Sequence, residues 1–336
     1  MMTAMVIAPK PKPEPEPEPE VGADIAWQPC PRETWDALTR QAGQSSLEQA
    51  WAYGAAIESE QGLRAERGLI VGQGGEPLAL VQAFCRDRLG LRIARVLRGP
   101  IWLIDPPDDP REDPRAPAVC ETIARQFRRR RFGDFLFWLP ELPDTPQSAA
   151  MLRAQSLRPV VTGYSSIWLD LRSPLEALRA GLHGKWRNAL RQAEKASFDV
   201  GVTTNPRRLN QSLQLYDRFR RKKRFVGPSG DFIAALAGHD RKAVVALTAR
   251  LGGDQVAGVI LVRHGRAATY LASWTSDDGR VGQAHNLLLW RGIETLKAGG
   301  IDWLDLGGVN TESQPGIARF KLGLGGEVFT LAGTYL

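Results

Sequence analysis

The sequence has few of the residues that mark metal sites, disulfide-rich domains and membrane spans. It contains three cysteines and four histidines in 336 residues. The histidines are scattered and adjoin no cysteine pair, which argues against a zinc site. The isolated cysteines favour buried thiols in a reducing compartment. No window approaches the roughly 18 apolar residues of a membrane span, and the N-terminus is a poor secretory signal. We therefore expect a cytoplasmic protein with no bound cofactor, metal or transmembrane segment.

Motifs of several enzyme classes are also missing. The chain has neither a Gly-x-Ser-x-Gly nucleophile elbow nor a phosphate-binding Walker loop. Asp302 and Asp305 lie three positions apart on an expected strand, so their side chains should diverge. A paired-carboxylate site is therefore not expected.

What the sequence does have is an excess of positive charge. Its 44 Lys and Arg exceed its 37 Asp and Glu, which gives a formal net charge of +7. This balance favours a polyanionic partner such as RNA, a nucleotide diphosphate or an anionic membrane surface. Basic runs at 128–131 and 220–224 could follow an RNA backbone. Such runs are more often solvated surface, so charge alone does not choose the partner.

The order of the elements indicates a duplicated unit. Residues 9–20 alternate proline with lysine and then glutamate, which predicts an extended, disordered tail over 1–22. A first domain over 23–160 should open with two short helices. Its further elements are expected as strands at 69–71, 78–85 and 91–97, a helix at 116–129 and a strand at 132–139.

A second domain over 161–316 is expected to repeat this order. Its elements should be helices at 174–196 and 210–224, strands at 243–251, 256–263 and 267–274, a helix at 284–298 and a strand at 302–306. The hairpin at 74–81 matches the one at 252–259 in sequence. The glycine-rich segment 317–336 should then return towards the first domain. We predict an α+β protein with two such domains, each a mixed, largely antiparallel sheet flanked by helices.

Candidate site residues gather near the C-terminus. Lys321 precedes three glycines in four positions, Gly323, Gly325 and Gly326, where the backbone can approach a ligand closely. The lysine could contact a phosphate or stabilise an oxyanion. The alternative is a β-bulge or strand crossing with Lys321 in solvent. His285, at the mouth of this region, could be an acid or base, although a surface or capping role is more common.

Two further segments suit anion binding. The helix at 174–196 has an apolar stripe and a basic face with Lys185 and Arg187, which could grip phosphates or simply be solvated. The loop at 279–284 could present the amides of Gly282, Gln283 and Ala284 to a donor pyrophosphate, or form a plain helix cap.

Together these segments resemble the FemAB family of aminoacyl-tRNA-dependent peptidoglycan-bridge transferases, which are tandem acetyltransferase (GNAT)-like proteins. The resemblance covers nearly everything after residue 24. It rests on residues 45–51, 98–100, 185–188, 215–216, 305–308 and 316–321 with the glycines that follow.

The resemblance implies amide formation, in which an acceptor amine attacks an activated carbonyl. Lys321 and Phe320 would lie at the donor end and act in catalysis. Arg187 and Lys185 would hold the diphosphate of a nucleotide- or lipid-linked muropeptide, with Tyr216 and Arg98 also at the substrate. Peripheral contact with the inner membrane surface stays open.

The donor is the least constrained part of this interpretation. Aminoacyl-tRNA is expected from the resemblance, but the chain shows no long helical-hairpin insertion of the kind some members use for tRNA. An acyl-CoA-dependent N-acyltransferase acting on an amino-sugar or exopolysaccharide precursor is the alternative. A non-catalytic RNA-binding or scaffold protein is the third.

Overall fold

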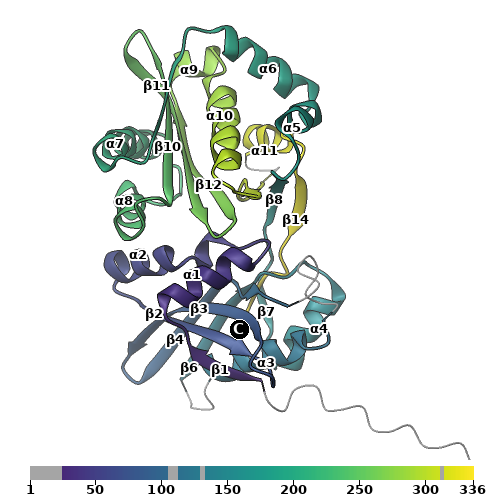
Figure 1. The fold of residues 1–336 in the computed structure, drawn as a ribbon. Coiled ribbons are helices and arrows are strands. Elements are labelled where there is room, and N and C mark those ends of the chain that lie inside the picture. Colours follow the sequence, from purple (N-terminus) through teal and green to yellow (C-terminus); the bar gives the residue numbers. More distant parts are fainter. Residues whose placement is uncertain (1–24, 105–112, 129–132, 311–313) are drawn as a thin grey trace, which may run out of the picture.

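The computed structural model describes residues 25–104, 113–128, 133–310 and 314–336. The predicted tail at 1–22 lies outside them. The described chain forms two sheets, one above the other in Figure 1, each flanked by helices. The fold is α+β, as predicted. No helix of the described residues is long and apolar enough to cross a membrane.

The first sheet has the strand order β1-β2-β3-β4-β6-β15-β7, with β5 also paired to β3. These strands are β1 (Ala26–Pro29), β2 (Arg64–Val71), β3 (Pro77–Arg88), β4 (Leu91–Gly99), β5 (Ile101–Trp102), β6 (Asp134–Pro140), β7 (Pro159–Val161) and β15 (Thr334–Tyr335). The accompanying helices are α1 (Arg32–Gln41), the 3-10 turn η1 (Leu47–Gln49), α2 (Trp51–Gln61), α3 (Ala116–Phe127) and α4 (Pro146–Ala154).

The second sheet has the order β14-β8-β13-β12-β11-β10-β9. Its strands are β8 (Ser165–Asp170), β9 (Asp199–Thr203), β10 (Val244–Leu251), β11 (Asp254–His264), β12 (Ala267–Thr275), β13 (Trp303–Asp305) and β14 (Glu327–Thr330). Its helices are α5 (Leu175–Gly181), α6 (Gly184–Lys195), α7 (Pro206–Lys223), α8 (Gly230–His239), α9 (Asp277–Val281), α10 (Ala284–Ala298) and α11 (Pro315–Leu322).

The predicted repeat is present in the pairing of the strands. An antiparallel meander, β2-β3-β4, is followed by α3 and by β6, which pairs parallel to β4. In the second half, β10-β11-β12 is followed by α10 and by β13, which pairs parallel to β12. Each helix covers its sheet because its apolar stripe packs against the buried, alternate residues of the strands. The exact domain boundaries stay a prediction.

Two predicted elements differ from the structure. The helix expected over 174–196 is two helices, α5 and α6, separated at Leu182 and His183. The expected apolar stripe persists across the break, because Leu182, Trp186 and Leu190 all enter the second core. The β-bulge or strand crossing considered as the alternative for Lys321 is not what forms, because residues 320–322 are the last turn of α11.

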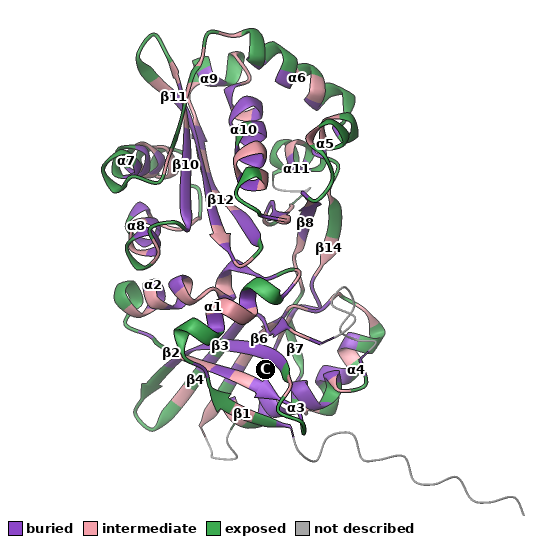
Figure 2. Cartoon of the chain, viewed as in Figure 1, coloured by how far each residue is buried: buried purple, intermediate pink, exposed green. Residues whose placement is uncertain are grey.

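The two halves share a hydrophobic cluster. Ala56 of α2 and Phe84 of β3 pack in it with Tyr216 of α7, Phe232 of α8 and Ile260 of β11. In Figure 2 the junction between the sheets, at α2 and α8, contains both buried and half-buried residues. The two sheets are therefore held together by apolar burial, which favours a fixed arrangement over free hinge motion.

Candidate active site

The second sheet splits beside α11. The parallel strands β12 and β13 pair only over 267–269 and 303–305, and β12 then continues to Thr275 paired with β11 alone. By contrast, β4 and β6 of the first sheet pair from Arg92 and Asp134 up to Gly99 and Pro140. Among the described residues, therefore, the parallel pair of the second half separates after three residues, whereas that of the first half stays paired along β4. The separation lies next to the predicted catalytic segment.

Lys321 lies at this split. It is 8% exposed, and its Nζ donates a hydrogen bond of 2.7 Å to the carbonyl oxygen of Gly308, just beyond β13. The ammonium is 5.9 Å from the centre of the Tyr270 ring, on the first β12 residue past the paired region. Burial lowers the pKa of Lys321 to about 8, and the negative charge of Asp305 opposes that shift. The alternative in which Lys321 points into solvent is therefore wrong.

Phe320 faces two helices that carry other candidate residues. Its ring centre is 5.8 Å from that of Trp186 on α6 and 5.2 Å from that of His285 on α10. The predicted contact of Phe320 with a donor base or ribose stays a prediction, because much of the ring already packs within the protein.

A chain of hydroxyl and imidazole groups continues from His285. Tyr270 donates from Oη to Ser273 Oγ at 2.6 Å, and His285 Nε2 lies 2.8 Å from the same Tyr270 oxygen. Burial lowers the pKa of His285 to about 4, so the imidazole is neutral at pH 7. The neutral imidazole can either donate to or accept from the Tyr270 hydroxyl, depending on its tautomer. Sequence patterns missed Tyr270 and Ser273, which look like ordinary strand residues.

The loop before α10 is a tight cap. Gln283 has a left-handed backbone (φ 58°), and α10 begins at Ala284. A side chain on Gly282 would meet the Phe198 ring at 2.4 Å. Packing alone therefore accounts for glycine at this position, and binding of a donor by these three residues stays a prediction.

The three C-terminal glycines also have packing roles. Gly325 has φ 81°, and a Cβ there would lie 2.8 Å from the carbonyl oxygen of Gly181 at the end of α5. A Cβ on Gly323 would lie 2.8 Å from Trp186, and one on Gly326 would meet the backbone of Trp168 at 2.7 Å. These close approaches bring α11 against α5, α6 and β8. The glycines position Lys321, and their role in holding a donor stays a prediction.

Two of the four predicted substrate residues are not at the surface. Tyr216 is fully buried on α7 and donates its hydroxyl to the carbonyl oxygen of Pro228 at 2.9 Å. Arg98 is 2% exposed. Lys185 is exposed on α6, and Arg187, on the same helix, is half-buried and donates to the Ala180 carbonyl oxygen at 3.2 Å. Lys185 and Arg187 therefore flank Trp186, whereas Tyr216 and Arg98 make interior contacts. Binding of substrate by these four residues stays a prediction.

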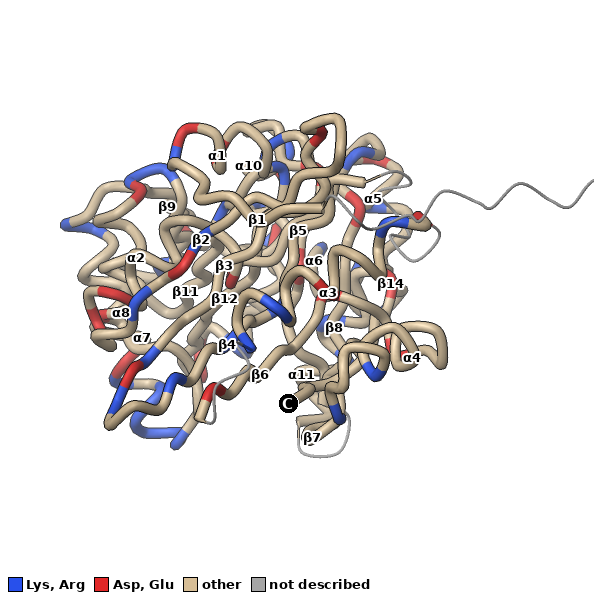
Figure 3. The backbone as a smooth tube through the Cα atoms, turned by 90° about the horizontal axis from the view of Figure 1, so that it is seen from below, with Lys and Arg blue, Asp and Glu red and all other residues tan. Residues whose placement is uncertain are grey.

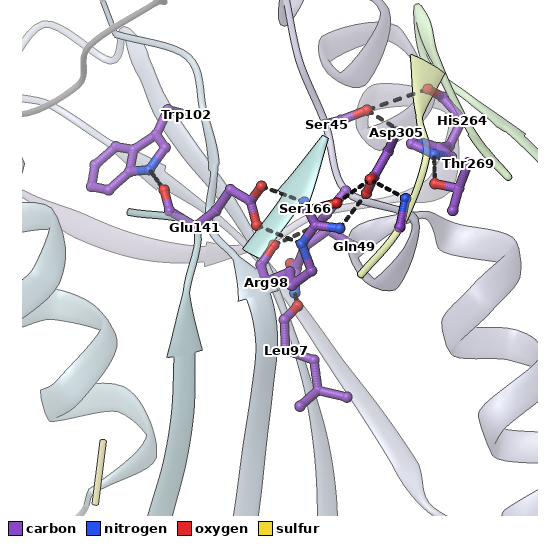
Figure 4. A network of polar contacts seen from close by, with 12 residues as sticks. Ser45, Gln49, Leu97, Arg98, Trp102, Glu141, Ser166, His264, Thr269 and Asp305 are labelled. Carbon is purple, nitrogen blue, oxygen red and sulfur yellow. Dashed lines mark hydrogen bonds and ion pairs between the residues drawn. The ribbon is translucent and has the colours of Figure 1, made fainter. Parts of the chain in front are cut away.

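Arg98 joins the two sheets through buried carboxylates. Its guanidinium forms a bidentate ion pair with Glu141, in which Nε donates to Oε2 at 2.8 Å and Nη2 donates to Oε1 at 2.7 Å. It also forms an ion pair with Asp305 of β13 (Figure 4). Asp305 also accepts from Ser166 Oγ at 2.5 Å and from the Gly307 amide at 2.7 Å. Burial alone would raise the pKa of Asp305. The charge of Arg98 and the hydrogen bond from Ser166 outweigh burial and hold this pKa below its usual value.

This network reaches the candidate catalytic lysine. Asp305 holds the amide of Gly307, which has φ 72°, and the carbonyl of the next residue, Gly308, accepts from Lys321. Arg98, Asp305 and the glycine turn therefore form a continuous path from the first sheet to Lys321. The predicted divergence of Asp302 and Asp305 is confirmed, since Asp302 pairs instead with Arg266.

The described residues hold no cluster of three or more His, Cys, Asp or Glu that could bind a metal ion. All three cysteines are buried free thiols, as predicted. The groups that lie together at the candidate site are a buried amine, a neutral imidazole and hydroxyl groups. This set can stabilise an oxyanion and orient an acyl group.

The split sheet and its helices form the second half of the molecule, and the first half repeats the meander, helix and parallel strand without the split. Residues 182–322 match the family described as an acetyltransferase (GNAT) domain. None of the curated proteins compared with the sequence matches it.

Solved structures extend this likeness to the whole chain. The crystal structure of FemX superposes with a TM-score of 0.77 at 12% identity, over 92% of this chain and 96% of that one. A tandem GNAT protein from the clavulanic acid biosynthesis pathway covers 93% of this chain and 98% of its own, with 14% identity and a TM-score of 0.53. The C-terminal domain of a putative lysylphosphatidylglycerol synthetase from Agrobacterium fabrum is 12% identical. It covers 90% of this chain and 91% of its own, with a TM-score of 0.54. The chain therefore has a FemAB-like tandem acetyltransferase fold, as the sequence resemblance implied.

Proposed function

We propose that the protein is an acyltransferase that forms an amide bond, moving an aminoacyl group from aminoacyl-tRNA to an amine of a cell-wall precursor. The observation that supports this most is Lys321, a buried ammonium held where β12 and β13 part, in a fold shared with FemX. Such a group suits a reaction in which negative charge develops on a carbonyl oxygen.

The reaction needs little more than positioning. The neutral acceptor amine attacks the ester carbonyl, and the tetrahedral oxyanion accepts a hydrogen bond from Lys321 Nζ. The amine nitrogen loses a proton, the carbon–oxygen bond to the ribose breaks, and the ribose hydroxyl leaves with a proton. Because the ester is already activated, a strong general base is not required.

An acyl-CoA donor is the second candidate. The match of residues 182–322 to an acetyltransferase domain favours it, as does the left-handed Gln283 that opens α10 beside His285. A thioester donor would use the same oxyanion contact, and its phosphates would meet the amides at the start of this helix.

A transfer assay with labelled donors tests the proposal. The purified protein is offered charged tRNA or acetyl-CoA separately, each with a mixture of muropeptide precursors. Lys321→Ala should lower transfer about 10²–10³-fold, as loss of an oxyanion donor does. The matched control is Lys242→Ala, which removes an exposed lysine on the turn before β10.

Each outcome has a separate meaning. Label moved from tRNA and lost in Lys321→Ala supports the proposal. Label moved only from acetyl-CoA replaces it with the second candidate. Transfer from neither donor, combined with binding to RNA that Lys321→Ala and Arg187→Ala both weaken, supports the non-catalytic alternative.

A further inference from the structure

One face of the first sheet is left open at one end. Side chains alternate along β4, so Ala94 and Val96 enter the core beneath α3, while Ile93 and Arg95 point the opposite way. Helix α2 and its neighbours cover that opposite face around Ala65, Phe84 and Leu97. The uncovered remainder, called the open face here, consists of Arg86, Arg88, Leu91, Ile93, Arg95 and Phe135.

The strand register brings these side chains together. Arg86 lies opposite Ile93, Arg88 opposite Leu91, and Ile93 beside Phe135 of β6. Leu91 is 46% exposed, Ile93 38% and Phe135 43%. Large apolar groups that adjoin on a surface mark an interaction site more strongly than scattered ones.

The charge of the open face has one sign. Within the described chain, no ion pair involves Arg86, Arg88 or Arg95. The nearby acids Glu66 and Asp87 belong to the other face, where they pair with Arg64 and Arg92. Figure 3 shows basic segments beside β4. Among the described residues, the open face therefore combines three arginines that form no ion pair with three apolar side chains, and none of its members is a carboxylate.

The hairpin that ends this face has an unusual tip. The turn between β3 and β4 is Leu89-Gly90, with φ 52° and 78°, and two positive φ values favour Asn-Gly in such turns. Leucine is disfavoured in this backbone conformation, yet Leu89 is 92% exposed. Figure 2 shows this end of the hairpin as exposed. Neither turn geometry nor packing explains a leucine here.

We propose that the open face and Leu89 bind an anionic lipid surface. Leu89 and Leu91 would enter the boundary between headgroups and acyl chains, while Arg86, Arg88 and Arg95 meet anionic headgroups. Apolar insertion flanked by basic side chains is the pattern of interfacial binding. Single-stranded RNA is the other polyanion that suits arginines beside an exposed phenylalanine, but base stacking does not account for an aliphatic tip. This proposal does not rest on the transfer reaction.

Co-sedimentation of the full chain with vesicles tests it. The vesicles are phosphatidylcholine alone, or equal parts of phosphatidylcholine and phosphatidylglycerol. The protein should bind only the anionic vesicles and release as NaCl rises. The variant with Arg86→Gln, Arg88→Gln and Arg95→Gln should bind on the order of 100-fold more weakly, at about fivefold per arginine.

Two further variants separate binding from folding. Leu89→Asn suits the turn better, so it should keep the fold while weakening binding to anionic vesicles several-fold. The control variant with Arg125→Gln, Arg153→Gln and Arg158→Gln removes the same charge from exposed positions on α3, on α4 and just after it. It should bind within about twofold of the wild type, since these positions lie away from the proposed contact.

Three results would overturn the proposal. They are absence of binding to anionic vesicles, equal loss in the two triple variants, and unchanged binding in Leu89→Asn. Binding of a single-stranded RNA oligonucleotide that is lost with the open-face arginines, without vesicle binding, would make this an RNA surface instead.

Discussion

At the scale of single residues, Lys321 carries most of the argument for function. Its amine is buried, yet its hydrogen bond to Gly308 uses only one of three donor positions. Burial lowers its pKa to about 8. The group is therefore charged at pH 7 and loses its proton as pH rises through the mildly alkaline range.

Lys321→Arg separates charge from geometry through the pH dependence of transfer. If the ammonium stabilises the oxyanion, wild-type activity should fall above about pH 8, as the protonated fraction drops tenfold per pH unit. The arginine variant, although weaker at pH 7, should keep its charge there. We therefore expect the ratio of wild-type to variant rates to decline above pH 8. The ratio cancels the ionisation of the acceptor amine, and a constant ratio from pH 7 to 10 would contradict the assignment.

Arg98 should matter for stability more than its single position suggests. Replacing it with methionine leaves Glu141 and Asp305 buried without their cation. The expected loss in the free energy of unfolding is about 3–5 kcal/mol, measured by urea denaturation. Arg280→Ala, which breaks an exposed pair with Asp277, should cost about 0–1 kcal/mol. Similar losses in the two variants would show that the buried network is not structurally important.

At the scale of elements, the site depends on how α11 is seated. Its last turn is followed by glycines that pack closely against α5, α6 and β8. These contacts fix the position of Lys321 beside the point where β12 and β13 part. The break between α5 and α6 belongs to the same arrangement, because the His183 amide donates to the Gly323 carbonyl oxygen at 2.9 Å.

Gly325→Ala should disturb this seating. The positive φ of 81° and the close approach to Gly181 predict a loss of about 1–3 kcal/mol in the free energy of unfolding, with a fall in transfer as Lys321 moves. Gly316→Ala is the matched control, since a Cβ there meets nothing within 4 Å and lies in the first turn of α11. Chemical denaturation and the transfer assay on both variants check this. Equal stability of the two would contradict it.

Sequence patterns predicted the elements better than they predicted the site. Alternating and helical periodicity located both meanders and α10, because those patterns follow from which residues must be buried. The break at Leu182 and His183 is flanked by Gly181 and Gly184, a local signal that the continuous apolar stripe across the break outweighs in an interpretation of the sequence. The glycine-rich motif predicts Lys321 as a site residue, and its role in catalysis stays a prediction. Arg98 and Tyr216 could be named but not placed, because burial by the other half of the molecule leaves no local pattern.

At the scale of the whole molecule, the two halves are joined by a shared core and by the Arg98 network. A destabilising change at the junction should therefore lower the stability of both halves. Phe232→Ala, in the cluster between α2 and α8, should cost about 3–5 kcal/mol.

Urea unfolding monitored by far-ultraviolet circular dichroism and by tryptophan fluorescence should show one shared transition in the wild type and in this variant. Two separate transitions would mean that the halves are independent units.

The last strand has a consequence for how the protein is made. Strand β15 does not lie at an edge but between β6 and β7 in the first sheet, with Tyr335 opposite Trp138 and Pro159. The N-terminal half leaves the ribosomal exit tunnel first during translation. Its sheet still lacks β15 until residue 335 has also left the tunnel. The nascent first half therefore waits with an unfilled gap in its sheet while the second half is still being translated.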